Sequence, residues 1–397
     1  MKNFIAVIGL GYVGLPLAVA AGKSGHTVVG VDLDIEKVKK INSGISPIED
    51  INNSEILNLV GRGLLKAQSD YSALKGADVI LFCVPTPLKS NHEPDLTYLE
   101  SAANSVSKNL SSGSLLILES TVAPGTTRDF LTPLIVNGSG IDIADLDIVF
   151  SPERIDPLNQ KWNLKNTPKI IAGLTSKSRK RAVDFYSKFV DEVIECEEVE
   201  VAETAKLLEN SFRLVNISFI NELSIFCQKL GININDVISA ASTKPYGFMP
   251  FYPSIGIGGH CIPVDPLYLS NKAQEIGAPA KMINLADQIN REMPGYFVGR
   301  AEEKIDGLKG KKILVVGVSY KPNVADVRET PVEALISGLK NKGAQVFWHD
   351  DLVKEWNGEM SVTLSSDFDL AIIATPHDYL DLTKLGNVPI LNTRGSI

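Results

Sequence analysis

A glycine fingerprint near the start constrains the fold of this chain more than any other feature. The apolar run FIAVIGL leads into Gly9, Gly11 and Gly14, which are spaced as GxGxxG and enclose Tyr12 and Val13. In such a turn the first glycine permits the tight bend, the second lets a pyrophosphate approach the backbone, and the third lets the next helix pack on the sheet. A strand, this turn and a helix predict a dinucleotide-binding unit whose cofactor contacts include all five residues.

Asp32 supports the same interpretation. It ends the next apolar run, HTVVGVD, 18 residues after Gly14. A carboxylate at that place accepts hydrogen bonds from a ribose hydroxyl and repels a 2′-phosphate, so NAD is the expected cofactor rather than NADP. Lys37 follows on a predicted helix, where it either reaches the cofactor or is an ordinary solvated lysine.

The composition indicates a folded protein of several domains. The chain has 397 residues, of which 44% are hydrophobic and 22% charged; it is too long for one ordinary core and has the balance of a globular protein. Its net charge of −8 and the lack of a dense Lys/Arg run disfavour a nucleic-acid partner. No apolar run approaches the ~20 residues that span a bilayer, so no membrane segment is expected.

The cysteines and histidines show neither a disulfide nor a metal-binding pattern. The four cysteines lack CxxC spacing and the histidines lack ligand spacing, so we expect no disulfide framework and no metal. The first residues predict a strand rather than a signal peptide, because glycines interrupt the apolar run and no small-residue cleavage site follows. The cytoplasm is therefore the expected location.

Two α/β segments flank a helical one. The runs FIAVIGL, HTVVGVD, DVILFCVP, SLLILEST, DIVFSPE and PKIIAGL alternate with helical patterns, which is typical of a parallel sheet covered by helices. The pattern returns with KKILVVGV, QVFWHD, LAIIAT and VPILNT. We therefore expect two Rossmann-like parallel-sheet domains, 1–197 and 306–397, joined by a central long helix and helical region, 198–305. A loop rich in Gly and Pro interrupts that region at 245–266.

The segment 198–230 predicts one long helix. Apolar residues recur at helical spacing, neither Gly nor Pro interrupts them, and Gly231 ends the segment. The apolar residues cover more than one face, which suits either a spine between domains or the seam of a homodimer. They are Val201, Ala205, Leu208, Phe212, Val215, Phe219, Leu223 and Phe226.

Two segments carry residues suited to covalent catalysis. In the loop FYPSIGIGGHCIPVDP, glycines precede Cys261 and Asp265 follows it, an arrangement that lets a substrate approach the sulfur closely. In the helical segment ETAKLLEN, Lys206 and Asn210 stand one turn apart on one face. A lysine close to Cys261 favours the thiolate, which is the nucleophilic form. In this setting we interpret Cys261 as a candidate nucleophile rather than an inert buried thiol.

The C-terminal α/β segment does not repeat the glycine fingerprint. Only Gly317 lies in the turn after its first strand, and Lys321 and Arg328 follow. Both cations can bind phosphates. We expect this segment to bind a nucleotide sugar rather than a second dinucleotide.

The motifs resemble, in order and along essentially the whole chain, those of the UDP-glucose/GDP-mannose dehydrogenase family. They are GLGYVGLPLA, VPTP, ESTVAPGTT, SPER, ETAKLLEN, GGHCIPVDP and YKPNVADVRETP. The resemblance implies an N-terminal NAD domain, a central helical dimerisation region and a C-terminal UDP-binding domain. It also implies two successive oxidations of a UDP-sugar, with two NAD per sugar, through a cysteine thiohemiacetal and a thioester.

The resemblance gives roles to the helix and the cysteine loop. Cys261 is the expected nucleophile that captures the aldehyde. Lys206 would stabilise the oxyanion and assist proton transfer, and Asn210 would donate a hydrogen bond to the same oxygen. Asp265 would be the partner of Lys206 or of the hydrolytic water. His260 either forms a dyad with Cys261 or contacts sugar or backbone, since adjacent residues in an extended loop usually point apart.

The other motifs supply further candidates. Thr121 would position water or substrate and contact NAD. Glu153 would act in proton transfer on the bound sugar, unless it is an exposed carboxylate paired with Arg154. Arg328 resembles the family arginine that reaches the cofactor and the active site. The remaining expected contacts are Pro85 and Thr86 to NAD, and Arg154, Phe251, Tyr252, Gly258 and Lys321 to the UDP-sugar.

Two departures from the family pattern bear on the sugar. Members that use UDP-glucose have NPEFLREG where this chain has SPERIDPLN, so that Pro157 replaces their second glutamate. Val264 stands where they have a lysine before the aspartate. The pattern is closer to that of the UDP-N-acetylglucosamine 6-dehydrogenases, so UDP-N-acetylglucosamine is the expected substrate. UDP-N-acetylmannosamine, UDP-N-acetylgalactosamine and UDP-glucose remain alternatives.

Two other classes of function compete with this interpretation. A β-hydroxyacid dehydrogenase also pairs a Rossmann domain with a helix-borne lysine and asparagine, but it needs neither Cys261 nor a C-terminal α/β unit. A nucleotide-binding regulator could keep the fold without the chemistry, although the intact Cys261, Lys206, Asn210 and Asp265 argue against it. The NADH formed per sugar separates the three classes: two, one or none.

Overall fold

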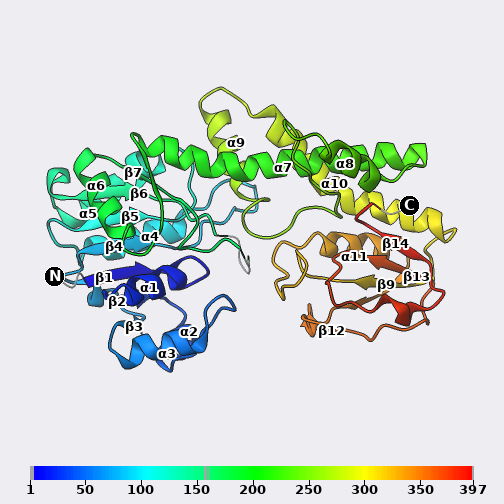
Figure 1. Cartoon of the computed structure of the whole chain (residues 1–397), viewed down its shortest axis with the longest axis horizontal. Coiled ribbons are helices and arrows are strands. Elements are labelled where there is room, and N and C mark those ends of the chain that lie inside the picture. Colours follow the sequence, from blue (N-terminus) through cyan, green and yellow to red (C-terminus); the bar gives the residue numbers. More distant parts are fainter. Residues whose placement is uncertain (1–3, 156–158, 160, 396–397) are drawn as a thin grey trace. The chain divides into compact units, whose positions relative to one another are not determined.

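The structure is a computed structural model that describes residues 4–155, 159 and 161–395. Pro157, on which part of the substrate prediction rests, lies outside the described residues. The chain divides into two compact units, Met1–Leu208 and Glu209–Ile397, and the boundary falls inside the long helix α7 (Val199–Leu230) (Figure 1).

The N-terminal unit is built on an eight-stranded sheet with the order β3-β2-β1-β4-β5-β6-β7-β8. All neighbouring strands are parallel except β6 and β7, which pair antiparallel. The strands are β1 (Phe4–Ile8), β2 (Thr27–Val31), β3 (Leu65–Gln68), β4 (Val79–Phe82), β5 (Leu115–Leu118), β6 (Asp147–Phe150), β7 (Lys169–Gly173) and β8 (Val193–Cys196). All six predicted strands are present, and β3 and β8 extend the sheet at its two edges.

Helices cover both faces of this sheet, as a buried parallel sheet requires. Side chains of β1 alternate: Ile5 and Val7 pack with α1 and α6, whereas Ala6 and Ile8 pack with α4, α5 and the first turn of α7. The α-helices are α1 (Gly14–Lys23), α2 (Ile35–Asn42), α3 (Asn53–Gly61), α4 (Thr97–Ser107), α5 (Thr132–Ser139) and α6 (Ser176–Tyr186). Two short 3₁₀ helices, η1 (Tyr71–Leu74) and η3 (Ile143–Asp145), and a π-helix, η2 (Thr126–Leu131), connect the larger elements.

The C-terminal unit carries a second, smaller parallel sheet with the order β10-β9-β13-β14. One face of β9 packs on α10 and α11, and the other packs on η4 and the segment after it. The elements are α8 (Ile234–Ser242), α9 (Asp265–Glu275), α10 (Lys281–Lys304), β9 (Lys312–Val316), α11 (Val332–Asn341), β10 (Gln345–His349), a hairpin of β11 (Glu355–Trp356) and β12 (Glu359–Met360), β13 (Leu370–Ile373), η4 (Leu382–Leu385) and β14 (Ile390–Asn392).

The predicted fold class is confirmed: two α/β units with parallel sheets, and a 32-residue helix that starts within one residue of the predicted 198–230 segment. The helix is uninterrupted because no residue in it lacks a backbone N–H or adds the freedom of glycine. No helix among residues 4–155 and 161–395 is long and apolar enough to cross a membrane.

Candidate active site

The glycine turn between β1 and α1 is shaped by both packing and ligand access. Gly9 has φ +90°, and a Cβ there would lie 2.6 Å from the carbonyl oxygen of Cys83. A Cβ on Gly14 would lie 1.9 Å from the carbonyl oxygen of Gly9. A Cβ on Gly11 would meet no described atom within 4 Å, so the backbone is open there to an incoming phosphate. A positive φ and a close backbone contact thus account for Gly9, a close backbone contact accounts for Gly14, and the open space at Gly11 leaves room for the predicted phosphate.

Asp32 is held at the end of β2, beside that turn. Its Oδ2 accepts a hydrogen bond from the backbone N–H of Leu10 at 2.8 Å and pairs with Lys37 Nζ at 2.9 Å. Its Oδ1 accepts from the N–H of Asp34 at 3.0 Å. The open backbone at Gly11, the N-terminus of α1 and this fixed carboxylate fit the pyrophosphate and adenosine ribose of NAD.

The loops that follow β4 and β5 are tied together at the same edge of the sheet. Thr86 Oγ1 donates to the carbonyl oxygen of Thr121 at 2.8 Å, and Ser120 Oγ donates to that of Val84 at 2.7 Å. Ligands of open parallel sheets bind at the carboxyl ends of the strands. The predicted NAD contacts Pro85, Thr86 and Thr121 thus lie on two connected loops at that edge.

Glu203, which the sequence analysis missed, ties the start of α7 to the Thr121 loop. Its buried carboxylate accepts hydrogen bonds from the N–H of Gly125 at 2.7 Å and from the N–H and Oγ1 of Thr127 at 2.9 and 2.6 Å. Burial raises the pKa of Glu203 to about 7 although these bonds favour the charged form. The signal was present in the sequence, because an acid in the first turns of a mostly apolar helix needs a partner.

A second group of residues that the sequence did not predict is a charged cluster next to the SPER motif. Lys169 Nζ donates to Glu119 Oε2 at 2.6 Å and to the carbonyl oxygen of Pro152 at 3.1 Å, and it pairs with Glu153 Oε2 at 3.5 Å. Tyr186 donates its hydroxyl proton to Glu119. The side chain of Glu153 is only 11% exposed, so Glu153 is not the exposed carboxylate of the alternative interpretation.

In the C-terminal unit, Cys261 lies on an exposed turn that is anchored to α7. The N–H of Asp265, the first residue of α9, donates to the carbonyl oxygen of Cys261 at 2.8 Å. Asn210 Nδ2 donates to Asp265 Oδ2 at 2.6 Å, and both side chains are buried. Lys206 stands one helical turn before Asn210 on α7 and is also buried. The helix and the cysteine loop are therefore connected through the Asn210–Asp265 bond.

The glycines before Cys261 allow close packing between two loops, a role that the sequence did not predict. A Cβ on Gly258 would lie 2.6 Å from the carbonyl oxygen of Glu329, and one on Gly259 would lie 2.9 Å from the ring of Tyr320. The N–H of Gly259 donates to the carbonyl oxygen of Arg328 at 3.2 Å. These glycines let the cysteine loop pack closely on the loop that carries the YKPNVADVRETP motif, which brings two predicted site segments together.

Charged groups of that second loop lie close to the cysteine loop. Arg328 Nε donates to Asp326 Oδ1 at 2.8 Å. Desolvation and the positive charge of Arg328 lower the pKa of His260, which keeps its imidazole neutral near physiological pH. Phe251 packs edge-on against Phe212 of α7 with ring centroids 5.7 Å apart.

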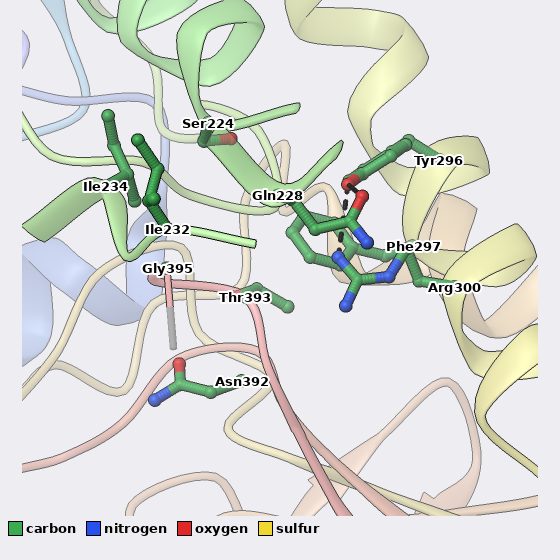
Figure 2. A pocket seen from close by; sticks show the side chains of 10 residues that line it. All are labelled: Ser224, Gln228, Ile232, Ile234, Tyr296, Phe297, Arg300, Asn392, Thr393 and Gly395. Atoms are coloured by element: carbon green, nitrogen blue, oxygen red, sulfur yellow. Dashed lines mark hydrogen bonds between the residues drawn. The ribbon is translucent and has the colours of Figure 1, made fainter. Parts of the chain in front are cut away.

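A separate pocket lies between the end of α7, α10 and the segment after β14 (Figure 2). Arg300 donates to the hydroxyl of Tyr296 at 3.1 Å, and that hydroxyl donates to Gln228 at 3.2 Å. Figure 2 shows these three side chains together in the pocket. None of the residues predicted from the sequence lines this pocket. The part of the chain that the structure describes also contains no group of three or more His, Cys, Asp or Glu that could hold a metal.

The first sheet with its glycine turn and Asp32 defines an NAD-binding protein of the Rossmann class. Comparison with known proteins narrows this class: the chain belongs to the UDP-glucose/GDP-mannose dehydrogenase family. The family's NAD binding domain matches residues 3–190, its central domain residues 200–292, and its UDP binding domain residues 314–393.

Relatives extend along nearly the whole chain. The chain is 36% identical to the UDP-N-acetyl-D-mannosamine dehydrogenase of Pyrococcus horikoshii over 383 residues, which cover 94% of this chain and 89% of the relative. It is 34% identical to the UDP-N-acetyl-D-glucosamine 6-dehydrogenase of Salmonella typhi, with the same coverage of 94% and 89%. The solved structure of the UDP-ManNAc dehydrogenase from Pyrococcus horikoshii superposes with a TM-score of 0.91 at 33% identity, covering 98% of this chain and 95% of that one. The protein is therefore an NAD-dependent nucleotide-sugar dehydrogenase.

Proposed function

We propose that this protein oxidises the C6 hydroxyl of a UDP-N-acetylhexosamine to a carboxylate, with Cys261 as the covalent nucleophile. The observation that carries the proposal is the anchored cysteine turn. Cys261 is exposed, whereas Asp265 and Asn210, which hold its loop on α7, are buried. A reactive cysteine needs access to substrate and a fixed position, and this turn has both.

The N-terminal unit binds the oxidant. NAD, when bound, accepts the hydride released in each of the two oxidations. The turn from Gly9 to Gly14 would receive its pyrophosphate, with the backbone open at Gly11, and Asp32 would accept hydrogen bonds from its ribose hydroxyls. The further contacts that we assign to it are Tyr12, Val13, Lys37, Pro85, Thr86, Thr121 and Arg328.

The first oxidation converts the alcohol to an aldehyde. The hydroxyl proton passes to a base, and the electron pair of the C6–H bond leaves as hydride. Lys206 and Asn210 bind the substrate oxygen as it gains negative charge, since both donate hydrogen bonds. Glu153 and Thr121 act in proton transfer and in positioning water or substrate.

The second oxidation is covalent. The thiolate of Cys261 adds to the aldehyde carbon, and the carbonyl oxygen becomes the oxyanion of a thiohemiacetal, stabilised by Lys206 and Asn210. Collapse of that oxyanion expels the second hydride and forms a thioester. Water then attacks the thioester, its proton is taken up by Glu153, and the Cys261 thiolate leaves. The products are one uronate, two NADH and protons that return to solvent, and the enzyme is regenerated.

The preferred substrate is UDP-N-acetylglucosamine. The support is the SPERIDP sequence, which departs from the motif of the UDP-glucose enzymes, and the name of the Salmonella typhi relative. UDP-N-acetylmannosamine is the second candidate, because the Pyrococcus horikoshii relative is named for it. For the uridine diphosphate, we assign Lys321 and Arg328 to the phosphates. Arg154, Phe251, Tyr252, Gly258 and His260 are the further contacts assigned to the substrate.

Counting cofactor tests this proposal. The purified chain is incubated with a limiting amount of each UDP-sugar and excess NAD, and NADH is measured against uronate. Two NADH per uronate support the proposal. One NADH per sugar, with the oxidation ending at a carbonyl, would assign the chain to the simple hydroxyl dehydrogenases, and none would favour a nucleotide-binding regulator.

We also propose that the protein works as a homodimer in the cytoplasm, with domains 1–197, 198–305 and 306–397. Side chains of α7 that are about half exposed support the dimer: Val201, Leu208, Phe212, Phe219, Phe226 and Leu230. The four cysteines are thiols, as is usual in a reducing compartment.

A further inference from the structure

Four polar side chains are buried together behind the SPER loop. Lys169 begins β7, Glu119 follows β5, Glu153 follows β6 and Tyr186 ends α6. β7 runs antiparallel to β6 with Phe150 opposite Ala172, so the first residues of β7 extend past the end of β6 and lie along the SPER loop. This reversal of the sheet is what brings Lys169 to Pro152 and Glu153.

The cluster is held by specific bonds. Relative exposure is 3% for the side chain of Lys169 and 0% for that of Glu119. Glu119 accepts from Lys169 on one oxygen and from Tyr186 on the other. Burial lowers the pKa of Lys169, but the two carboxylates outweigh burial and raise it, so the ammonium stays charged. A buried ammonium between two carboxylates is costly to maintain, which is a reason to look for its function.

Glu153 is held by hydrogen bonds at one oxygen, and its other oxygen is buried beside Lys169 without a hydrogen-bond partner among the described residues. Oε1 accepts from the N–H of Arg154 at 2.6 Å and from that of Ile155 at 2.8 Å, and Oε2 faces Lys169 Nζ at 3.5 Å. The other ionisable groups around it are Cys83, which contributes a buried thiol, and Arg154, whose guanidinium donates to the carbonyl oxygen of Pro168 at 2.8 Å.

We propose that Lys169, held in place by Glu119 and Tyr186, is a positioning residue that holds the Glu153 carboxylate in the orientation needed for proton transfer. The inference rests on the proton-transfer role of Glu153 in the proposed function. Lys169 Nζ pairs with Glu153 Oε2, and its bond to the carbonyl oxygen of Pro152 fixes the backbone that carries Glu153. Glu119 accepts the hydrogen bonds of Lys169 and Tyr186 and so holds the ammonium in place, while burial raises the pKa of Glu119 to about 7.

The test replaces the ion pair without leaving a buried charge. In Lys169→Met/Glu119→Gln both charges are lost together, and the amide oxygen of the new glutamine can still accept from Tyr186. We expect kcat for the four-electron reaction to fall about 10- to 100-fold, a large part of the usual contribution of a general base, while KM for the UDP-sugar changes by less than about twofold. Lys169→Arg, which keeps the charge, should recover most of kcat.

The matched control is Lys177→Met, which removes a lysine that is 64% exposed and pairs with Asp147 in the same unit. It should leave kcat and KM at wild-type values. Glu153→Gln serves as the reference for loss of the base. A second measurement needs no substrate: hydrogen exchange of the Arg154 and Ile155 amides, which donate to Glu153, should be faster in the double variant and unchanged in Lys177→Met.

The outcomes are distinct. Wild-type kcat and amide exchange in the double variant would overturn the proposal while the proposed function stood. Faster exchange throughout the N-terminal unit of the double variant, with KM and kcat altered alike, would show that Lys169 has only a structural role and would overturn the proposal. Loss of kcat in a folded Lys169→Arg variant would overturn it as well. If the wild-type chain formed no NADH from any UDP-sugar, the proposed function would fail, and the exchange measurement would still decide whether Lys169 fixes Glu153.

Discussion

Cys261 differs from the three other cysteines in its exposure. Cys83 and Cys227 are buried and Cys196 is intermediate, whereas Cys261 is exposed at the start of a turn bonded to α7. Burial raises the pKa of Cys83 well above that of a free thiol, which suits a packing role. At the scale of single residues, accessibility separates the candidate nucleophile from the rest.

Replacing Cys261 by serine should separate the two oxidations. Lys206 and Asn210 remain to bind the alcohol, but a serine hydroxyl is a much weaker nucleophile at neutral pH. Uronate formation should fall by several orders of magnitude, with oxidation to the aldehyde less affected. Rapid-quench analysis of aldehyde and uronate checks this, with Cys196→Ser as the control. Two NADH per sugar at the wild-type rate in Cys261→Ser would return Cys261 to a packing role.

Asp32 should decide between the two nicotinamide cofactors. The wild-type kcat/KM should strongly favour NAD over NADP, because the carboxylate repels a 2′-phosphate. In Asp32→Ser, Lys37 loses its partner and can pair with that phosphate, so the preference should fall by at least about tenfold. Steady-state kinetics with both cofactors measure the ratio, and Asp34→Ser, which leaves Asp32 and Lys37 in place, is the control. Equal use of NAD and NADP by the wild type would show that Asp32 does not contact the ribose.

Asp350 is a residue of the second unit whose contribution to stability depends on pH. Its buried carboxylate accepts from the N–H groups of Val318, Leu352 and Val353 and from His377 Nε2, all within 3.1 Å. Burial alone would raise the pKa of Asp350, but these bonds lower it from 3.8 to about 2. The folded state therefore favours the carboxylate, and the stabilisation is complete above the unfolded pKa and lost as pH falls from about 4 towards 2.

Asp350→Asn should consequently lower the free energy of unfolding by about 2 kcal/mol at pH 6. The difference from the wild type should shrink as the pH is lowered through about 4 to 3. Urea unfolding at a series of pH values measures it. Asp351→Asn, at a neighbouring side chain that is 43% exposed, should change stability by less than about 0.5 kcal/mol. A destabilisation that did not vary with pH would mean that shape rather than charge is responsible.

Single residues also show where prediction from the sequence reached its limit. Gly9, Asp32, Asn210 and Cys261 belong to local patterns, so their neighbours in sequence reveal them. Lys169 and Glu119 do not, because their meeting depends on β7 running antiparallel to β6, a reversal that apolar runs do not encode. The close packing of Gly258 and Gly259 on Tyr320 could not be predicted either, because Tyr320 lies far away in the sequence.

At the scale of elements, α7 was predicted almost completely because its signal is long and periodic. The edge strands β3 and β8 were not predicted, since their sequences LKAQ and VIEC mix charged with apolar residues. An edge strand has a neighbouring strand on one side only, so it is less buried and needs no continuous apolar run.

The exposed aromatic residues of α7 lead to a prediction about assembly. Phe219 and Phe226 are 59% and 57% exposed and lie seven residues apart, two turns along the helix. In Phe219→Glu/Phe226→Glu, burying two carboxylates in the proposed seam would be unfavourable, so the protein should become monomeric. Light scattering at micromolar concentration measures the mass. Leu57→Glu, at an equally exposed position of α3, should not change it. A wild-type chain that is already monomeric would contradict the dimer.

At the scale of the whole molecule, the choice of sugar is the central question. We expect kcat/KM for UDP-N-acetylglucosamine to exceed that for UDP-glucose by at least about a hundredfold, since a site that binds the N-acetyl group leaves polar groups unpaired when it is missing. A panel that also includes UDP-N-acetylmannosamine and UDP-N-acetylgalactosamine measures the order. A mannosamine preference would favour the second candidate, and activity confined to UDP-glucose would show that the SPERIDP departure was misinterpreted.

The position of the boundary between the two compact units has a consequence for how this chain can be divided. Most domains are separated by an exposed linker, where proteases cut and where genes tolerate insertions. Here the boundary lies between Leu208 and Glu209, inside the continuous turns of α7. A break at this point would leave two frayed helix ends, each with unpaired backbone groups. Neither limited proteolysis nor recombination should therefore release a stable half at this boundary, and the two units are expected to be inherited together.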